Sequence, residues 1–95
     1  MQAMTTPATT GPLDVDPALV GTLELPGLDL PYVDLNDEPF VHTRLRLDDT
    51  EYAYDRTYPV KGHSAVMPAA VAELQSAGRR VLVAERNERY YLYLA

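Results

Sequence analysis

The clearest hydrophobic pattern in the chain follows Ser64 and has the period of a helix. Apolar residues recur three and four positions apart, so they share one face of a predicted helix: Met67, Ala70, Val71, Leu74 and Ala77. Pro68 fits the first turn, where its missing N–H costs little, and either Ser64 or Met67 can precede that turn as the cap. Gly78 predicts the end of the helix, because a residue with positive φ commonly closes one.

After Gly78 the pattern changes to that of a β-hairpin. Val81–Glu85 and Tyr90–Leu94 are apolar or β-branched, and Asn87 and Glu88 between them favour a turn. A two-residue loop would pair Glu85 with Tyr90, Val83 with Leu92 and Val81 with Leu94. One face is then expected to meet the helix, whereas the other needs a different cover: Leu82, Ala84, Tyr91 and Tyr93.

A second hairpin is predicted before the helix. Phe40–Leu47 alternates between apolar and polar residues, Asp48-Asp49 favours a turn, and Glu51–Tyr58 follows as a strand. The second strand should carry four side chains on one face: Tyr52, Tyr54, Arg56 and Tyr58. We therefore predict an α+β fold over residues 38–95, with one helix on a mostly antiparallel sheet in the order ββαββ. This order resembles that of protein G and the β-grasp class, a likeness of topology that implies no function.

Residues 1–37 are predicted to form a long extended N-terminal arm. Met1–Pro12 is rich in Thr, Ala, Pro and Gly and has no period, and Asp16-Pro17 favours a single capped helical turn. Leu23–Asp37 then repeats an acidic residue between two aliphatic ones, followed by turn formers. This repeat resembles the pentapeptide-repeat family, but it is shorter than one coil of that family and contains Pro26 and Pro31. A proline-stiffened arm therefore explains the segment better.

The arm carries more apolar side chains than a linker needs, so we expect it to dock on its own domain or on a neighbour. Tyrosine is favoured at interfaces, because it covers apolar area while keeping one polar end in water. The expected partner interface combines the arm with the tyrosine-rich face of the sheet: Leu23, Leu25, Leu28, Leu30, Tyr32, Leu82, Tyr91 and Tyr93.

Composition narrows the classes of partner. The formal net charge of −6 argues against binding nucleic acid through a basic surface. The charge is uneven, because residues 1–55 have a balance of −9 and residues 56–95 one of +3. There is no cysteine for a disulfide or a thiolate zinc site, and no apolar run of membrane-spanning length. The sequence also lacks a signal-peptide pattern, so the expected location is cytoplasmic, or the virion if the protein is viral.

Candidate chemistry is sparse. His42 and His63 are the histidines of the chain, and neither lies in a metal-binding motif. Lys61-Gly62-His63-Ser64 precedes the helix and could hold an anion beside a histidine base, but it matches no phosphate-binding loop. Paired carboxylates such as Asp14/Asp16, Asp37/Glu38 and Asp48/Asp49 fall in predicted turns or tail. The sequence thus predicts no catalytic, cofactor-binding or metal-binding residue.

The leading hypothesis is a non-enzymatic structural or assembly protein. Its arm and its tyrosine-rich face would dock on further copies or on a larger complex, as in a phage or viral structural protein. The first alternative is a small regulatory binding module, antitoxin-like or an adaptor, and the second is a small enzyme that uses His63. The expected partner is protein, with no nucleic acid, membrane or cofactor.

Overall fold

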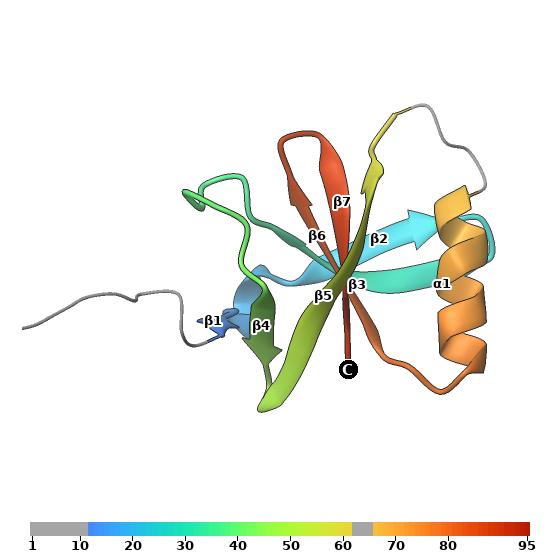
Figure 1. Ribbon diagram of the computed structural model, residues 1–95, viewed down its shortest axis with the longest axis horizontal. Coiled ribbons are helices and arrows are strands. Elements are labelled where there is room, and N and C mark those ends of the chain that lie inside the picture. Colours follow the sequence, from blue (N-terminus) through green and yellow to red (C-terminus); the bar gives the residue numbers. More distant parts are fainter. Residues whose placement is uncertain (1–11, 62–65) are drawn as a thin grey trace, which may run out of the picture.

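The computed structural model describes residues 12–61 and 66–95, and within them it contains one α-helix and a seven-stranded sheet (Figure 1). The elements in chain order are β1 Leu13–Asp14, the 3-10 helix η1 Pro17–Leu19, β2 Gly21–Leu25, β3 Leu28–Asp34, β4 Arg44–Leu47, β5 Thr50–Pro59, α1 Val66–Ser76, β6 Val81–Arg86 and β7 Arg89–Leu94. The strand order is β1-β4-β5-β7-β6-β3-β2. Four of the six pairings are antiparallel, so the predicted α+β class with one helix on a mostly antiparallel sheet is confirmed.

The helix ends where the sequence predicts. Gly78 has a φ of 83°, and its N–H donates to the carbonyl of Gln75 at 2.9 Å. The Arg79 N–H reaches the carbonyl of Leu74 at 3.0 Å, which completes the pair of bonds typical of a glycine-closed helix. Of the predicted apolar stripe, Met67 and Val71 are buried, whereas Ala77 is exposed beyond the last turn.

The C-terminal hairpin has the predicted register. Val81 lies opposite Leu94, Val83 opposite Leu92 and Glu85 opposite Tyr90. Both turn residues have a left-handed backbone, with φ of 53° at Asn87 and 60° at Glu88. Two positive φ values in a two-residue loop give the turn twist that suits a hairpin.

The other predicted hairpin differs in two details. β4 begins at Arg44, so Phe40–Thr43 is loop rather than strand. In β5 the register shifts between Tyr54 and Arg56, so Asp55 is an extra residue without a partner. Tyr52 therefore packs in one core and Tyr58 against the other, and the prediction that both share a face is wrong. The alternation rule fails here because one extra residue moves every later side chain of β5 to the opposite face of the sheet.

β1, β2 and β3 lie in the same sheet as the ββαββ strands. β2 and β3 form an antiparallel hairpin around Pro26-Gly27, and β3 pairs in parallel with β6. β1 pairs in parallel with β4 at the opposite edge. The segment predicted to be an arm is thus extended, but it belongs to the sheet, and the hairpin at Leu23–Asp34 replaces the coil that the pentapeptide-like repeat would imply. Its leucines lie on one face of the hairpin, whereas Val33 lies on the other.

Two cores lie on the two faces of β6 and β7. α1 covers one of them, where Met67 and Val71 pack on Leu30, Val81, Val83, Leu92 and Leu94. On the other side, β1, β4 and the first part of β5 fold over the sheet (Figure 1). Leu82, Ala84 and Tyr93 are buried there against Val15, which follows β1, and against Val33 of β3, Leu45 of β4 and Tyr52 of β5. The chain therefore covers both faces itself. Among the residues described, no helix has the length and apolar character that crossing a bilayer would take.

Candidate functional site

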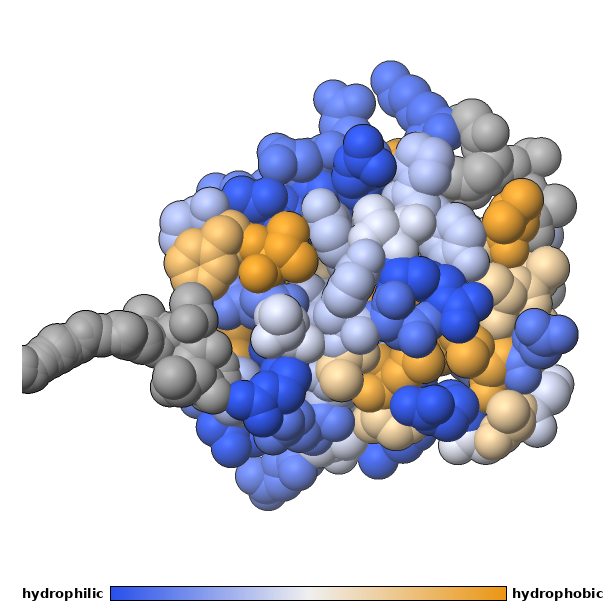
Figure 2. All heavy atoms as spheres, viewed as in Figure 1, coloured by the Kyte–Doolittle hydropathy of each residue, from blue (hydrophilic) through white to orange (hydrophobic). Residues whose placement is uncertain are grey.

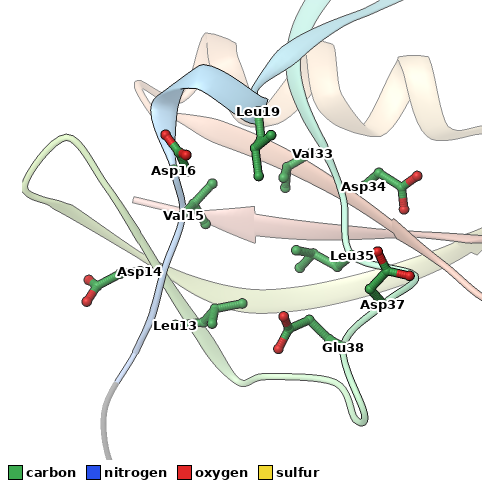
Figure 3. A pocket seen from close by; sticks show the side chains of 10 residues that line it. All are labelled: Leu13, Asp14, Val15, Asp16, Leu19, Val33, Asp34, Leu35, Asp37 and Glu38. Carbon is green, nitrogen blue, oxygen red and sulfur yellow. The ribbon is translucent and has the colours of Figure 1, made fainter.

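A hollow in the described part of the molecule lies between the segment from β1 to η1 and the end of β3 (Figure 3). Its volume is about 230 Å³. Five aliphatic side chains turn toward its centre, and acidic side chains stand around them (Figure 3). We call it the acidic groove; its lining is Leu13, Val15, Leu19, Val33 and Leu35 with Asp14, Asp16, Asp34, Asp37 and Glu38.

One wall of the acidic groove is the segment from β1 through η1. The Val15 N–H donates to the carbonyl of Arg46 at 2.8 Å and holds this segment on β4. Asp14 adds an ion pair with the Nε of Arg46 at 2.7 Å. The Asp16 carboxylate accepts a bond from the Ala18 N–H at 2.9 Å and caps η1. η1 in turn presents Leu19 to solvent, where 69% of this residue is exposed.

The opposite wall, residues 34–38, is fastened to the β6–β7 hairpin. The Leu35 N–H donates to the carbonyl of Glu85 at 2.9 Å, and the Asn36 side chain accepts the Asn87 N–H at 2.9 Å. Arg86 donates from Nε to the carbonyl of Glu38 at 3.1 Å. A wall with this many bonds to a hairpin turn is preformed, so a ligand would lose little free energy in ordering it.

The electrostatics of the acidic groove are one-sided. Five carboxylates line it, and one of them, Asp14, is paired with Arg46. Glu38 bonds to His42 at 2.9 Å, and Asp37 makes no hydrogen bond or ion pair with the described residues. The groove therefore favours a cationic ligand.

The carboxylates do not converge as metal ligands do. Asp14 and Asp16 point away from Asp34 across the hollow (Figure 3). Across residues 12–61 and 66–95, no three His, Asp or Glu side chains come close enough to hold a metal ion. The arrangement instead suits an elongated ligand, with an aliphatic part on the floor and cationic groups at the rim.

The size of the hollow bears on the class of ligand. Pockets for small molecules occupy roughly 300–1,000 Å³ and enclose most of the ligand. At about 230 Å³ with an open side, the acidic groove is smaller. It has room for one or two side chains of a longer ligand that continues over the surface.

The structure separates the predicted partner-interface residues into two groups. Leu30, Leu82 and Tyr93 are at most 1% exposed, so they belong to the cores and no partner can reach them in this fold. The others are partly buried at the margins of the cores: Leu23, Leu25, Leu28, Tyr32 and Tyr91. The members of the predicted interface thus lie on opposite faces of the sheet, and their part in binding stays a prediction.

Several tyrosines pack in or beside the two cores. The Tyr93 hydroxyl donates to the carbonyl of His42 at 2.7 Å, and burial raises the pKa of Tyr93 to about 12. Tyr54 packs against the rings of Tyr91 and Tyr93, with centroids 6.0 and 5.9 Å away. The Tyr32 hydroxyl donates to Glu85, and burial followed by this bond raises the pKa of Tyr32 above its usual range.

The remaining sequence candidates give no second site. Lys61 is exposed, whereas Gly62, His63 and Ser64 lie outside the described residues. His42 packs against Phe40 with the two rings tilted and their centroids 4.7 Å apart, and it bonds to Glu38 at the margin of the acidic groove. Asp48 and Asp49 form the β4–β5 turn with φ of 51° and 66°.

Sequence reasoning missed the acidic groove because its two walls are separated by the β2–β3 hairpin. A signal was nevertheless present. Residues 1–43 contain no Lys or Arg, so any surface that they build is acidic. The uneven charge therefore marked the region, although only the fold brings residues 13–19 and 33–38 together.

Comparisons of the chain with protein-family models, curated proteins and solved structures find no match. The function proposed below therefore rests on the geometry and charge of the acidic groove.

Proposed function

We propose that this is a non-enzymatic binding protein that docks on a partner protein through the acidic groove. The observation that carries the proposal is the aliphatic floor ringed by five carboxylates. An exposed apolar surface with a polar rim is typical of protein–protein interaction sites. Charge complementarity gives the partner its chemistry: a segment with Arg or Lys flanking one or two aliphatic side chains.

An assembly subunit and a regulatory module both fit this surface. They differ in what the groove engages, which is a component of a larger complex in one case and a single regulated protein in the other. Neither role requires β1, β2 or β3 to detach from the sheet. Removal of residues 1–36 would delete β1, β2 and β3, so point variants of the intact chain are the better test.

The decisive experiment uses Asp37→Lys. Asp37 is exposed and has no bond to the described residues, so the charge reversal should leave the fold intact. We expect the partner recovered with the intact chain to bind this variant about tenfold more weakly, measured by titration with the purified partner. Raising the salt concentration should reduce the difference, because it screens an exposed charge.

Glu73→Lys is the matched control. Glu73 is exposed on α1, away from the acidic groove, and its replacement changes the net charge by the same amount. Leu19→Ser tests the apolar floor separately and should also weaken binding. Equal affinities of the Asp37→Lys and Glu73→Lys variants would refute the proposal.

A further inference from the structure

β2 is an open edge of the sheet. It lies at the end of the strand order, and no described segment pairs with its outer side. The opposite edge strand, β1, has two residues, whereas β2 has five. Natural edge strands are commonly protected by Lys, Pro, a bulge or extreme shortness. Gly21–Leu25 has no Lys, no Pro and no register shift, and its one charged residue is Glu24.

The register of the β2–β3 hairpin identifies the backbone groups that face outward. Leu25 lies opposite Leu28 across a two-residue turn, so this pair is hydrogen-bonded, and bonded pairs alternate from there. The N–H and C=O groups of Leu23 consequently face β3. Those of Thr22 and Glu24 face away from the sheet and are available to another strand.

We propose that β2 pairs antiparallel with β2 of a second copy of this chain, about a twofold axis through Leu23. Thr22 then lies opposite Glu24 of the second copy, and Glu24 opposite its Thr22. Each of these two pairs exchanges both of its backbone bonds, which gives four hydrogen bonds. The dimer has one continuous sheet, and both copies of α1 lie on the same face.

The neighbouring registers fit less well. An axis through Glu24 would place the two Glu24 carboxylates opposite each other, and like charges in that position repel. An axis through Thr22 would pair Glu24 with Val20, whose N–H already donates to the carbonyl of Pro17 at 3.2 Å. On the other side, Pro26, which has no N–H, ends the pairing between the two β2 strands, which we call the seam. The axis through Leu23 is thus the register that uses every outward group.

The side chains of this register are also complementary. Leu23 meets its own copy in a non-hydrogen-bonded pair, where side chains approach most closely. Leu25 lies over Gly21 of the second copy, and nothing stands within 4 Å of the place where a Cβ would be on Gly21. Leu23, Leu25 and Leu28 are partly buried against the core beneath α1, so the seam extends this core. Hydrophobic side chains reach the surface around α1 in Figure 2.

Hydrogen exchange tests the seam directly. A seam of five residues gives a weak, concentration-dependent dimer. We expect the amides of Thr22 and Glu24 to become more slowly exchanging as the concentration of the full chain rises. The Leu23 amide, which bonds within the hairpin, should be equally protected at all concentrations. A chain that stays monomeric at every concentration, or a dimer in which the Thr22 and Glu24 amides gain no protection, overturns the proposal.

A charge exchange tests the register. Thr22→Glu places two carboxylates opposite each other at two positions and should raise the dissociation constant of the dimer about tenfold, measured by analytical ultracentrifugation. Adding Glu24→Lys to the Thr22→Glu chain restores opposite charges and should return the dissociation constant to that of the original chain or lower. Thr22→Lys, the matched control, faces Glu24 and should not weaken the dimer. If Thr22→Glu and Thr22→Lys have the same effect, the register is wrong.

Discussion

Residues with a left-handed backbone set where the elements of this chain end. Asp48 and Asp49 close one hairpin, Asn87 and Glu88 close another, and Gly78 ends α1. Asp and Asn tolerate this conformation better than most residues, and glycine adopts it without strain. The sequence therefore marked the Asp, Asn and Gly positions, because the conformational preference belongs to these residues; Glu88 has no such preference and takes the conformation as the second residue of its turn.

Gly78→Ala is expected to destabilise the protein by about 1–2 kcal/mol, because a Cβ disfavours the left-handed conformation. Apart from its own local backbone, no described residue has an atom within 4 Å of the added Cβ, so the loss would come from the backbone alone. Gly21, which also has open space and lacks a positive φ, provides the control: Gly21→Ala should change the free energy of unfolding by less than about 0.5 kcal/mol. Urea unfolding of dilute protein measures both. Equal stability of the two variants would contradict this account.

At the scale of elements, the sequence predicted those helices and hairpins whose signals lie within a short stretch of chain. The α1 stripe and the β6–β7 register follow from side-chain period and turn chemistry within short stretches. The parallel pairings of β1 with β4 and of β3 with β6 join segments far apart in sequence, and no local pattern specifies them. The groove could not be predicted for the same reason, because Val15 and Val33 meet only after both pairings form.

The docking of α1 depends on a few side chains. Met67 is fully buried in the core beneath the helix, whereas 60% of its neighbour Val66 is exposed. Met67→Ala should therefore lower the free energy of unfolding by about 2–5 kcal/mol, through lost burial and the cavity left behind. Val66→Ala should cost less than about 0.5 kcal/mol. Chemical denaturation compares the two, and a cost of Met67→Ala no larger than that of Val66→Ala would contradict the assigned packing.

The whole molecule is a sheet with a core on each face, and partly or fully buried tyrosines lie in or beside both. Tyr32 and Tyr90 pack against the core beneath α1, and Tyr93 belongs to the other core. Burial raises the pKa of each: that of Tyr93 to about 12, and those of Tyr32 and Tyr90 above the usual range. The folded state therefore holds these phenols neutral at pH values where the unfolded chain would ionise them.

Stability should consequently fall in alkali. Below the unfolded tyrosine pKa of about 10, both states are protonated and the contribution to stability is complete. Above it the unfolded state releases protons first, so the free energy of unfolding decreases as pH rises toward the folded pKa values. For Tyr93 this window ends near pH 12. Thermal unfolding measured from pH 9 to pH 12 should show the decline, with a shallower slope for Tyr93→Phe. A stability that does not change over this range would contradict it.

The extra residue at Asp55 also determines how the two cores are connected. Because of this residue, β5 contributes side chains to both cores: Tyr52 packs in one core and Tyr58 packs against the other. The two cores are therefore also joined through this single strand, because β5 contributes a side chain to each of them.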